Sequence, residues 1–352
     1  MKILLYILSK IYCVLVLFWS KLYDKNILKP TTFTTPILAI GNVVVGGSGK
    51  TPMTIYLSNL LSKKDIRHIV ISRGYKKKQA GSFVVSDNSG LVCKNPFLCG
   101  EEPLLLAKKL SGVPVIVGEN KITSIRLGIE RFKPQLVLID DGFQTRKIKI
   151  DFHCVLIDSL VKKKDFYYLP FGLLREPLSG LKRANIIILT KKNLSKNNNS
   201  LLLPVFNLAQ AHNLSIISSE YKASFYVFNK KSQSLNPIDP SSSIKESAFL
   251  MCGIAREESF KIIAEKKYQN ITDYYFFKDH HLYSEKELSL IFSKQDKKSS
   301  LVCITTYKDF IKIQSLDSLI NSCAVEFHII DIEHVLNDEE EKVLEEKIKV
   351  LF

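Results

Sequence analysis

A short apolar segment that breaks into a glycine-rich turn constrains this chain more than any other feature. Residues 37–42 are apolar with strand character, residues 45–51 read VGGSGKT, and residues 52–61 suit a helix. A strand, a glycine-rich turn and a helix in this order form the layout of a phosphate-binding P-loop. Pro52 falls in the first turn of the helix, where its missing N–H costs little. The sequence therefore predicts a nucleotide phosphate site after this strand.

Each residue type in the turn has a chemical reason to be there. Glycines let the backbone curl without Cβ clashes, so that successive N–H groups face a polyphosphate. The positive end of the following helix points to the same place. Lys50 can reach the β- and γ-phosphates, and the Thr51 hydroxyl can coordinate Mg²⁺. The residues expected to surround the phosphates are Gly46, Gly47, Ser48, Gly49, Lys50 and Thr51.

The turn departs from the most common P-loop spacing, G-x-x-x-x-G-K-[ST]. Val44 stands where the first glycine belongs, and the run is closer to the variant K-G-G-x-G-K-T with Val45 replacing the leading lysine. The alternative interpretation is a glycine-rich turn whose lysine points into water. The strand before the turn and the helix after it favour nucleotide binding.

A second strand supplies paired carboxylates. Residues 135–139 end in an unbroken apolar run, which is typical of a strand buried on both faces, and Asp140 and Asp141 follow it directly. We interpret this as a Walker B strand, in which Asp140 holds Mg²⁺ and Asp141 orients or deprotonates an attacking hydroxyl. Asp-Asp-Gly alone is an ordinary turn, and the upstream P-loop is what favours the functional interpretation. By contrast, residues 190–193 lack the aspartate of a guanine-binding motif, so we interpret them as the start of a loop.

The order of the elements predicts the fold class. Strands alternate with helices, which indicates an α/β fold with a P-loop NTPase-like parallel sheet sandwiched by helices. A chain of 352 residues favours two domains. The Ser/Lys/Pro-rich stretch after residue 219 interrupts the rhythm, and we place a linker there. The expected divisions are an N-terminal helix at 1–26, a P-loop domain at 27–219, a linker at 220–245 and a smaller α/β domain at 246–352 that closes over the site.

The net charge of +15 suits an anionic partner, although a lysine-rich surface facing water explains it equally well. The sequence contains no zinc finger, RNP-like aromatic pattern or basic zipper, so we do not expect nucleic acid to be the partner. Nothing in it indicates an obligate protein partner. The seven cysteines are scattered and never spaced C-x-x-C, which indicates reduced thiols in a cytosolic compartment.

The N-terminus predicts an amphipathic helix. Its apolar residues recur at spacings of three and four, at positions 4, 8, 11, 15, 18 and 22. The longest unbroken apolar run, residues 11–19, is shorter than the roughly 20 residues that cross a bilayer. An in-plane membrane helix flanked by Trp19, Tyr23 and lysines fits best. A spanning helix, or a first helix docked on the protein's own core, remains open.

Several further motifs accompany these features along nearly the whole chain. They are IGN at 40–42, GGSGKTP at 46–52, SRGY at 72–75, GEEPLLL at 100–106, DDGFQ at 140–144, LPFG at 169–172, LREPLSG at 174–180, CGI at 252–254, Asp279-His280 with Tyr283, and TTYKD at 305–309. In this order the chain resembles the tetraacyldisaccharide 4′-kinases, or lipid A 4′-kinases, of Gram-negative bacteria. The runs DDGFQ and LREPLSG are long and unusual, which makes the resemblance specific.

The resemblance implies transfer of the ATP γ-phosphoryl group, with Mg²⁺, to the 4′-hydroxyl of a tetraacylated glucosamine disaccharide 1-phosphate. It also implies a peripheral enzyme on the cytoplasmic face of the bacterial inner membrane.

The residue roles that the resemblance implies fall into three groups. Lys50, Asp141, Glu101 and His280 are expected to be catalytic, with His280 acting from the second domain. Thr51, Asp140 and Glu102 are expected at the metal. The residues expected to hold substrate are Asn42, Arg73, Gln144, Arg175 and Glu176.

Two positions depart from the family's pattern. The family usually has Gly-Asp-Glu-Pro, and in this chain Glu101 replaces the aspartate. The family usually has a histidine after the glutamine of DDGFQ, and in this chain Thr145 follows Gln144. Neither change removes phosphate binding or the paired aspartates, so we expect activity to be retained, with an altered pH dependence.

Two other classes of function compete with this interpretation. A P-loop ATPase switch at the membrane surface needs neither residues 174–180 nor Asp279 and His280. A kinase or ligase of a soluble metabolite would keep its activity without membranes after deletion of residues 1–22. A basic nucleic-acid-binding module fits the charge alone.

Overall fold

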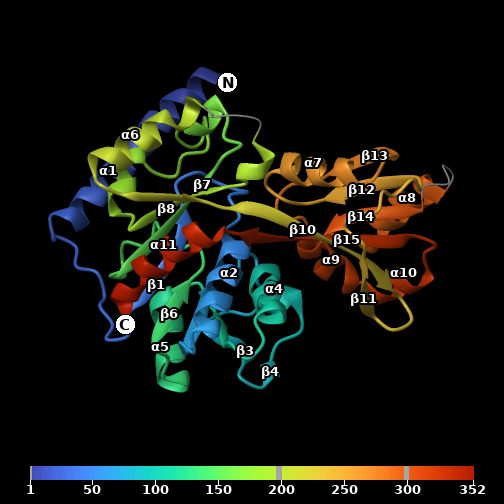
Figure 1. The fold of residues 1–352 in the computed structure, drawn as a ribbon, viewed down its shortest axis with the longest axis horizontal. Helices are drawn as coiled ribbons and strands as arrows, with labels where there is room; N and C mark the ends of the chain where they lie inside the picture. Colours follow the sequence, from blue (N-terminus) through green and yellow to red (C-terminus); the bar gives the residue numbers. More distant parts are fainter. Residues whose placement is uncertain (1, 196–199, 297–300) are drawn as a thin grey trace. The chain divides into compact units, whose positions relative to one another are not determined.

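The computed structural model describes residues 2–195, 200–296 and 301–352. The chain forms two compact units (Figure 1). The first comprises Met1–Lys94, Glu102–Tyr221 and His334–Phe352, and the second comprises Asn95–Glu101 and Lys222–Glu333. The predicted α/β fold, with a P-loop NTPase-like sheet and a second, smaller α/β unit, is confirmed.

The first unit is built on a nine-stranded sheet with the order β4-β3-β5-β2-β6-β1-β7-β8-β9. All neighbours pair in parallel except the edge strands β3 and β4, which are antiparallel. The strands are β1 (Ile37–Asn42), β2 (His68–Ser72), β3 (Phe83–Asp87), β4 (Gly90–Leu91), β5 (Val115–Val117), β6 (Leu136–Ile139), β7 (Phe152–Asp158), β8 (Ile186–Thr190) and β9 (Ser215–Ser218).

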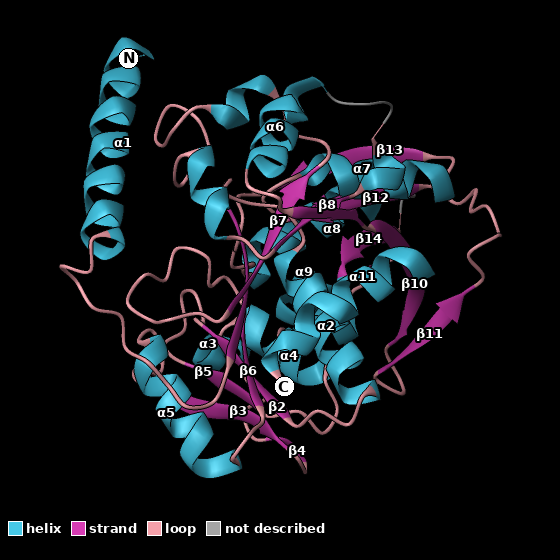
Figure 2. Ribbon diagram, turned by 60° about the vertical axis from the view of Figure 1, so that its left-hand side comes forward, coloured by secondary structure: helices cyan, strands magenta, loops and turns pink. Residues whose placement is uncertain are grey.

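Helices accompany this sheet. They are α1 (Lys2–Asp24), α2 (Lys50–Lys63), α4 (Glu101–Lys109), α5 (Lys121–Phe132), α6 (Leu203–Ala211) and α11 (Asp338–Ile348), and the short 3₁₀ turns are η1 (Lys163–Phe166), η2 (Leu178–Arg183), η3 (Lys192–Leu194), η4 (Ser200–Leu202) and η5 (Lys349–Leu351). Figure 2 shows α1 as a rod joined to the rest of its unit by a long connection. The central strands β1 and β6 are buried along their whole length, because nearly all their side chains are apolar.

The order of the strands explains why the site forms where it does. Strand β1 lies between β6 and β7, so the glycine-rich turn after β1 and the aspartates after β6 emerge at the same edge of the sheet. Alternate residues of β1, Ile37 and Ala39, pack with Ile125 of α5 in one core cluster. Ligands of parallel α/β sheets bind at the carboxyl ends of the strands, and both predicted motifs lie there.

The second unit contains a six-stranded sheet with the order β11-β10-β15-β14-β12-β13. Its parallel part is β13, β12, β14 and β15, and the β10–β11 pair is antiparallel. The elements are β10 (Glu220–Asn229), β11 (Ser234–Ile238), β12 (Ala248–Cys252), β13 (Ile271–Phe276), β14 (Val302–Thr306), β15 (Glu326–Val335), α3 (Pro96–Cys99), α7 (Glu257–Lys267), α8 (Glu285–Asp296), α9 (Tyr307–Gln314) and α10 (Asp317–Ser322). An aromatic-rich core that includes Phe249, Phe310 and Phe327 holds it together.

The structure differs from the predicted domain boundaries in three places. Residues 95–101, predicted within the domain at 27–219, belong to the second unit. Residues 220–245, predicted as a linker, contain β10 and β11, whose polar residues occupy exposed positions of an otherwise half-buried ribbon. The C-terminal helix α11, predicted in the second domain, belongs to the first unit. There Glu340 accepts hydrogen bonds from Ser218, and Glu345 pairs with Lys64 at 2.8 Å.

Candidate active site

The glycine-rich turn has the backbone conformation that a P-loop needs. Gly46, Gly47 and Gly49 all have positive φ values, of 80°, 56° and 83°. L side chains rarely adopt this region, which explains why glycine occupies the three positions. Gly49 is the residue directly before α2, and Lys50 begins that helix. The turn therefore delivers the N-terminal end of α2 to the edge of the sheet, as the sequence predicts.

Asn42 supports this turn from inside. Its side chain is fully buried, and its amide nitrogen donates to the carbonyl oxygen of Val44 and, at 2.8 Å, to the hydroxyl of Ser48. Gln144 donates to the backbone carbonyl of Asn42 at 2.7 Å. The structure thus places Asn42, which the sequence predicts as a substrate residue, where it fixes the shape of the loop.

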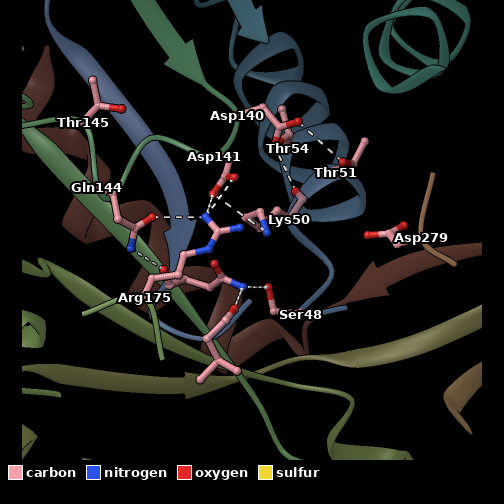
Figure 3. Close-up of polar contacts among 12 residues, drawn as sticks. Ser48, Lys50, Thr51, Thr54, Asp140, Asp141, Gln144, Thr145, Arg175 and Asp279 are labelled. Atoms are coloured by element: carbon pink, nitrogen blue, oxygen red, sulfur yellow. Dashed lines mark hydrogen bonds and ion pairs between the residues drawn. The ribbon is translucent and has the colours of Figure 1, made fainter. Parts of the chain in front are cut away.

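The side-chain oxygen atoms of Thr51, Thr54 and Asp140 form a cluster beside the turn, and this corner could hold a cation. The hydroxyl oxygens of Thr51 and Thr54 lie 3.5 and 3.1 Å from the two carboxylate oxygens of Asp140 (Figure 3). Burial, together with the negative charges of Glu102 and Asp141, raises the pKa of Asp140 to about 7. A cation at this corner would relieve that electrostatic cost. Mg²⁺ prefers one or two carboxylates together with hydroxyl, water and phosphate oxygens, so Thr51 and Asp140 fit it.

Asp141 lies at the centre of a ring of positive charge. A single guanidinium nitrogen of Arg175 donates to both of its carboxylate oxygens, at 2.8 and 3.0 Å, and the Lys50 ammonium lies 3.9 Å away (Figure 3). Burial opposes ionisation of this carboxyl group. The charges of Lys50, Arg175 and Lys121 outweigh it and hold the pKa of Asp141 at about 2. Asp141 is therefore ionised, and it pairs with Lys50 of the P-loop and with Arg175 of the LREPLSG motif.

The predicted substrate residues form a chain of contacts with Asp141. Arg175 also donates to the amide oxygen of Gln144 at 3.2 Å, and the amide nitrogen of Gln144 donates to Glu176 at 2.8 Å. Glu176 is buried and accepts a second hydrogen bond, of 2.7 Å, from Arg183. Gly180 is required next to it, because a Cβ there would approach a Glu176 carboxylate oxygen to 2.3 Å. Glu176 thus anchors Gln144 and Arg183.

Arg73 occupies a different position from the other predicted substrate residues. It follows β2 directly, and its side chain is exposed. Because β2 is parallel to its neighbour β6, Arg73 lies at the same edge of the sheet as Asp140. The pKa of Lys121 is lowered, mainly because its ammonium group is buried, and the positive charge of Arg73 contributes to this lowering.

The second unit carries a cluster of its own around Glu101. This carboxylate is buried and contacts His280 at one oxygen, with the ammonium of Lys308 3.1 Å from the same oxygen and that of Lys312 2.9 Å from the other. Burial opposes its ionisation, but Lys308, His280 and Lys312 hold the pKa of Glu101 well below its usual range. The structure thus brings together Glu101 and His280, two residues predicted to be catalytic.

A buried aspartate fixes Lys312. Asp309 is fully buried and lies 2.8 Å from the Lys312 ammonium. It accepts hydrogen bonds from the backbone N–H of Gly253 at 3.0 Å and from the hydroxyl of Thr306 at 2.7 Å. Gly253 of the motif at 252–254 and Thr306 of the motif at 305–309 therefore hold the aspartate that fixes Lys312 beside Glu101.

Sequence reasoning missed one lysine beside the aspartates. Lys121 begins α5 after β5, and its ammonium donates to the backbone carbonyl of Asp141 and lies 3.4 Å from the hydroxyl of Thr145. The only sequence signal for this role is the position of Lys121 shortly after a strand, at the carboxyl edge of the sheet. Thr145 thus lies at the site, where it contacts a cation through a hydroxyl group.

It also missed the side chains behind the P-loop. Thr190 donates to the carbonyl of Ser48 at 3.1 Å, and His334 contacts the carbonyl of Gly49 at 3.0 Å. Lys191, interpreted as the start of a loop, is buried in an ion pair with Asp158 at 2.7 Å. No motif marks these residues.

Comparison with known proteins identifies the family. Residues 1–349 match the family described as tetraacyldisaccharide-1-P 4′-kinase. A tetraacyldisaccharide 4′-kinase of Halothermothrix orenii is 33% identical over 336 residues, which cover 90% of this chain and 85% of that protein. One of Flavobacterium johnsoniae is 35% identical over 297 residues, which cover 83% and 82%.

A solved structure agrees with the sequence comparison. It is described as the "apo" form of LpxK from Aquifex aeolicus in complex with ATP, and it matches with a TM-score of 0.71 and 28% identity over 98% of this chain and 97% of that one. The chain therefore belongs to the tetraacyldisaccharide-1-P 4′-kinase family, ATP-dependent kinases of lipid A biosynthesis.

Proposed function

We propose that this protein transfers the γ-phosphoryl group of ATP to the 4′-hydroxyl of a tetraacylated glucosamine disaccharide 1-phosphate, and that the transfer takes place beside Asp141. One observation carries the proposal: Asp141 is held between Lys50 of the P-loop and Arg175 of the LREPLSG motif. Lys50 is a donor-side residue, and Arg175 belongs to a motif that a simple ATPase does not need. Their shared carboxylate marks the place where phosphate and acceptor meet.

On the donor side, the backbone of Gly46, Gly47 and Gly49 supports a turn whose N–H groups face the phosphates. Ser48 belongs to the same turn, and Lys50 neutralises charge on the β- and γ-phosphates. Catalysis of phosphoryl transfer is mostly positioning and electrostatic stabilisation, since little covalent chemistry is left for the protein. The hydrogen bonds from Asn42 to Val44 and Ser48 fix the turn and so help to position the phosphates.

Mg²⁺ is the second cofactor in the proposal. Thr51 and Asp140 would hold it, and Glu102, whose charge reaches Asp140, would act from farther away. When bound, the ion supplies charge stabilisation between the phosphate oxygens. Among the described residues no cluster of three metal-binding side chains occurs. Proteins hold Mg²⁺ through one or two carboxylates and the substrate's own phosphates.

On the acceptor side, Asp141 orients the 4′-hydroxyl and accepts its hydrogen bond. Its low pKa makes it a weak base, so we assign it positioning of the hydroxyl more than early removal of the proton. Arg175 keeps the carboxylate in place, and Gln144 and Glu176 keep Arg175 in place. The exposed guanidinium of Arg73 is suited to an anionic group of the substrate.

Glu101 and His280 form a second catalytic pair in this proposal. Their direct contact and the two lysines around Glu101 keep the glutamate ionised and the histidine oriented. A glutamate in place of the family's aspartate is compatible with this arrangement, because its carboxylate reaches both His280 and Lys312.

The acceptor is a lipid, and α1 is suited to the surface of the cytoplasmic face of the bacterial inner membrane. Large apolar side chains of α1 are exposed, with Leu15 and Phe18 each 61% accessible. The helix is long and apolar enough to cross a membrane by length and composition. We favour an in-plane position, because the hydroxyl of Tyr12 donates to the carbonyl of Arg175 at 2.8 Å and so ties α1 to the acceptor motif.

The test is transfer of label from γ-labelled ATP to a detergent-dispersed tetraacylated glucosamine disaccharide 1-phosphate. We expect labelled lipid with the phosphate at the 4′ position, and loss of the product when that hydroxyl is blocked. Hydrolysis of ATP without labelled lipid would instead favour the membrane-surface ATPase switch. Labelling of a soluble acceptor by a chain that lacks residues 1–22 would favour a metabolite kinase.

A further inference from the structure

The carbonyl groups of a P-loop need partners on the side away from the nucleotide. When successive N–H groups of the turn face a polyphosphate, the carbonyls between them point elsewhere, and buried carbonyls require hydrogen-bond donors. The two carbonyls directly before Lys50 belong to Ser48 and Gly49. Thr190 donates to the first at 3.1 Å. The second accepts a backbone hydrogen bond of α2 from the N–H of Met53 at 3.0 Å, and the Nε2 atom of His334 lies 3.0 Å from the same oxygen as its side-chain donor.

We propose that His334 is a positioning residue for nucleotide binding, which holds the P-loop in its phosphate-binding shape through the Gly49 carbonyl. The proposal rests on the proposed function, because it assigns a support to the same ATP site. His334 lies at the end of β15, 285 residues from Gly49, and no motif of the sequence includes it.

The hydrogen bonds of His334 fix its protonation. A carbonyl oxygen only accepts, so Nε2 must carry the proton toward Gly49. The Nδ1 atom then accepts from the hydroxyl of Ser219, 2.9 Å away. Burial, reinforced by the charge of Lys191, lowers the pKa of His334 to about 4, which keeps the ring neutral. Both ring nitrogens therefore have defined partners, and the ring cannot turn without losing one of them.

Packing makes the support rigid. The rings of His334 and Tyr221 meet edge to face with their centroids 4.9 Å apart, and the Lys191 ammonium lies over the Tyr221 ring. A Cβ on Gly49 would approach the Tyr221 hydroxyl to 2.4 Å and His334 Nε2 to 2.6 Å. Glycine at position 49 thus answers two demands, the positive φ and the close approach of these two side chains.

Tyr221 and His334 lie at the ends of two chain segments of the first unit. Within the first unit, one segment ends at Tyr221 and the next begins at His334. Tyr221 and His334, which lie against Gly49, are therefore the residues at which the chain leaves this unit for the second time and returns to it. Local sequence around the P-loop contains no trace of that support.

The experiment measures ATP affinity of the full-length protein without acceptor, together with the shift in melting temperature that ATP produces. His334→Met keeps much of the side-chain volume but removes the donor. We expect its dissociation constant for ATP to rise about tenfold, the worth of one buried hydrogen bond. His334→Gln retains an N–H of similar reach and is expected to recover most of the affinity.

His328→Met is the matched control, because His328 is a buried histidine on the same strand that contacts Tyr268 and Glu326. It is expected to lower the melting temperature but leave ATP affinity within about twofold of wild type. Unchanged affinity in His334→Met, or equal losses in His334→Met and His328→Met, would overturn the proposal. So would a His334→Gln variant as weak as His334→Met.

Ser219→Ala provides a second variant if His334→Met does not fold. It leaves His334 in place but removes the partner of Nδ1, and we expect ATP affinity to fall roughly threefold. Wild-type affinity in this variant would then count against the support. The proposed function is tested separately, by lipid labelling: a protein that binds ATP but labels no lipid contradicts that function and leaves the role of His334 measurable.

Discussion

At the scale of residues, the surroundings of the carboxylates shift their pKa values in opposite directions. Asp140 and Asp141 are neighbours in the chain, yet burial among negative charges raises the pKa of the first to about 7, and surrounding cations hold that of the second at about 2. Glu101 belongs with the second kind, since lysines and a histidine surround it. Opposite environments for adjacent carboxylates suit opposite tasks, one facing a cation and the other a hydroxyl.

The cation that faces Glu101 gives a prediction about stability. Lys312→Met leaves the buried carboxylates of Glu101 and Asp309 without their shared ammonium, so we expect the free energy of unfolding at pH 7 to fall by about 3 kcal/mol. The double variant Lys312→Met with Asp309→Asn should lose less, because it orphans one charge fewer. Urea denaturation of the wild type and both variants measures these differences.

The same comparison has a defined pH dependence. The folded-state pKa of Glu101 lies below its usual value, so its ionisation stabilises the wild type above the ordinary glutamate pKa, and this contribution is lost as pH falls. Without Lys312 the folded-state pKa of Glu101 rises toward its ordinary value. The difference in the free energy of unfolding between wild type and Lys312→Met should therefore stay constant from pH 7 to pH 5 and narrow as pH falls below the ordinary glutamate pKa of about 4.3. A difference that stays the same below about pH 4 would contradict the assignment.

At the scale of elements, α1 has two kinds of surface. Two of its aromatic side chains contact its own unit: Tyr12 donates a hydrogen bond to the carbonyl of Arg175, and the ring of Tyr6 meets that of Phe171 edge to face. Its apolar stripe, which includes Leu15 and Phe18, is exposed. The stripe was visible in the sequence because helical periodicity is local. The docked side was not, because its partners lie more than 160 residues away.

Substituting the exposed stripe tests its role. Leu15→Ser with Phe18→Ser should lower binding to anionic vesicles about a hundredfold or more, since each buried large apolar side chain contributes about 1.5–3 kcal/mol. The melting temperature without vesicles should not fall, because both side chains are exposed in the fold. Vesicle co-sedimentation measures the binding. Val350→Ser, 75% exposed at the other end of the chain, is the control; equal binding by all three proteins would contradict the assignment.

At the scale of the whole molecule, sequence reasoning succeeded where motifs are local. The strand–turn–helix at β1 and α2 and the aspartates after β6 were predicted because neighbours in the chain are neighbours in the site. It failed where distant segments return. The helix α11 belongs to the first unit through side chains such as Glu340 and Glu345, and His334 reaches Gly49 from β15. Such contacts depend on the order of strands in the sheets, which periodicity does not encode.

The central claim is that Asp141, shared by Lys50 and Arg175, is where phosphate and acceptor meet. Phosphoryl transfer by wild type and Asp141→Asn at saturating ATP tests it most directly, with ATP affinity measured alongside. We predict that Asp141→Asn binds ATP as tightly as wild type or more tightly, because a negative charge near the phosphates is removed, while transfer to the lipid falls about a hundredfold or more. Transfer at the wild-type rate would contradict the account.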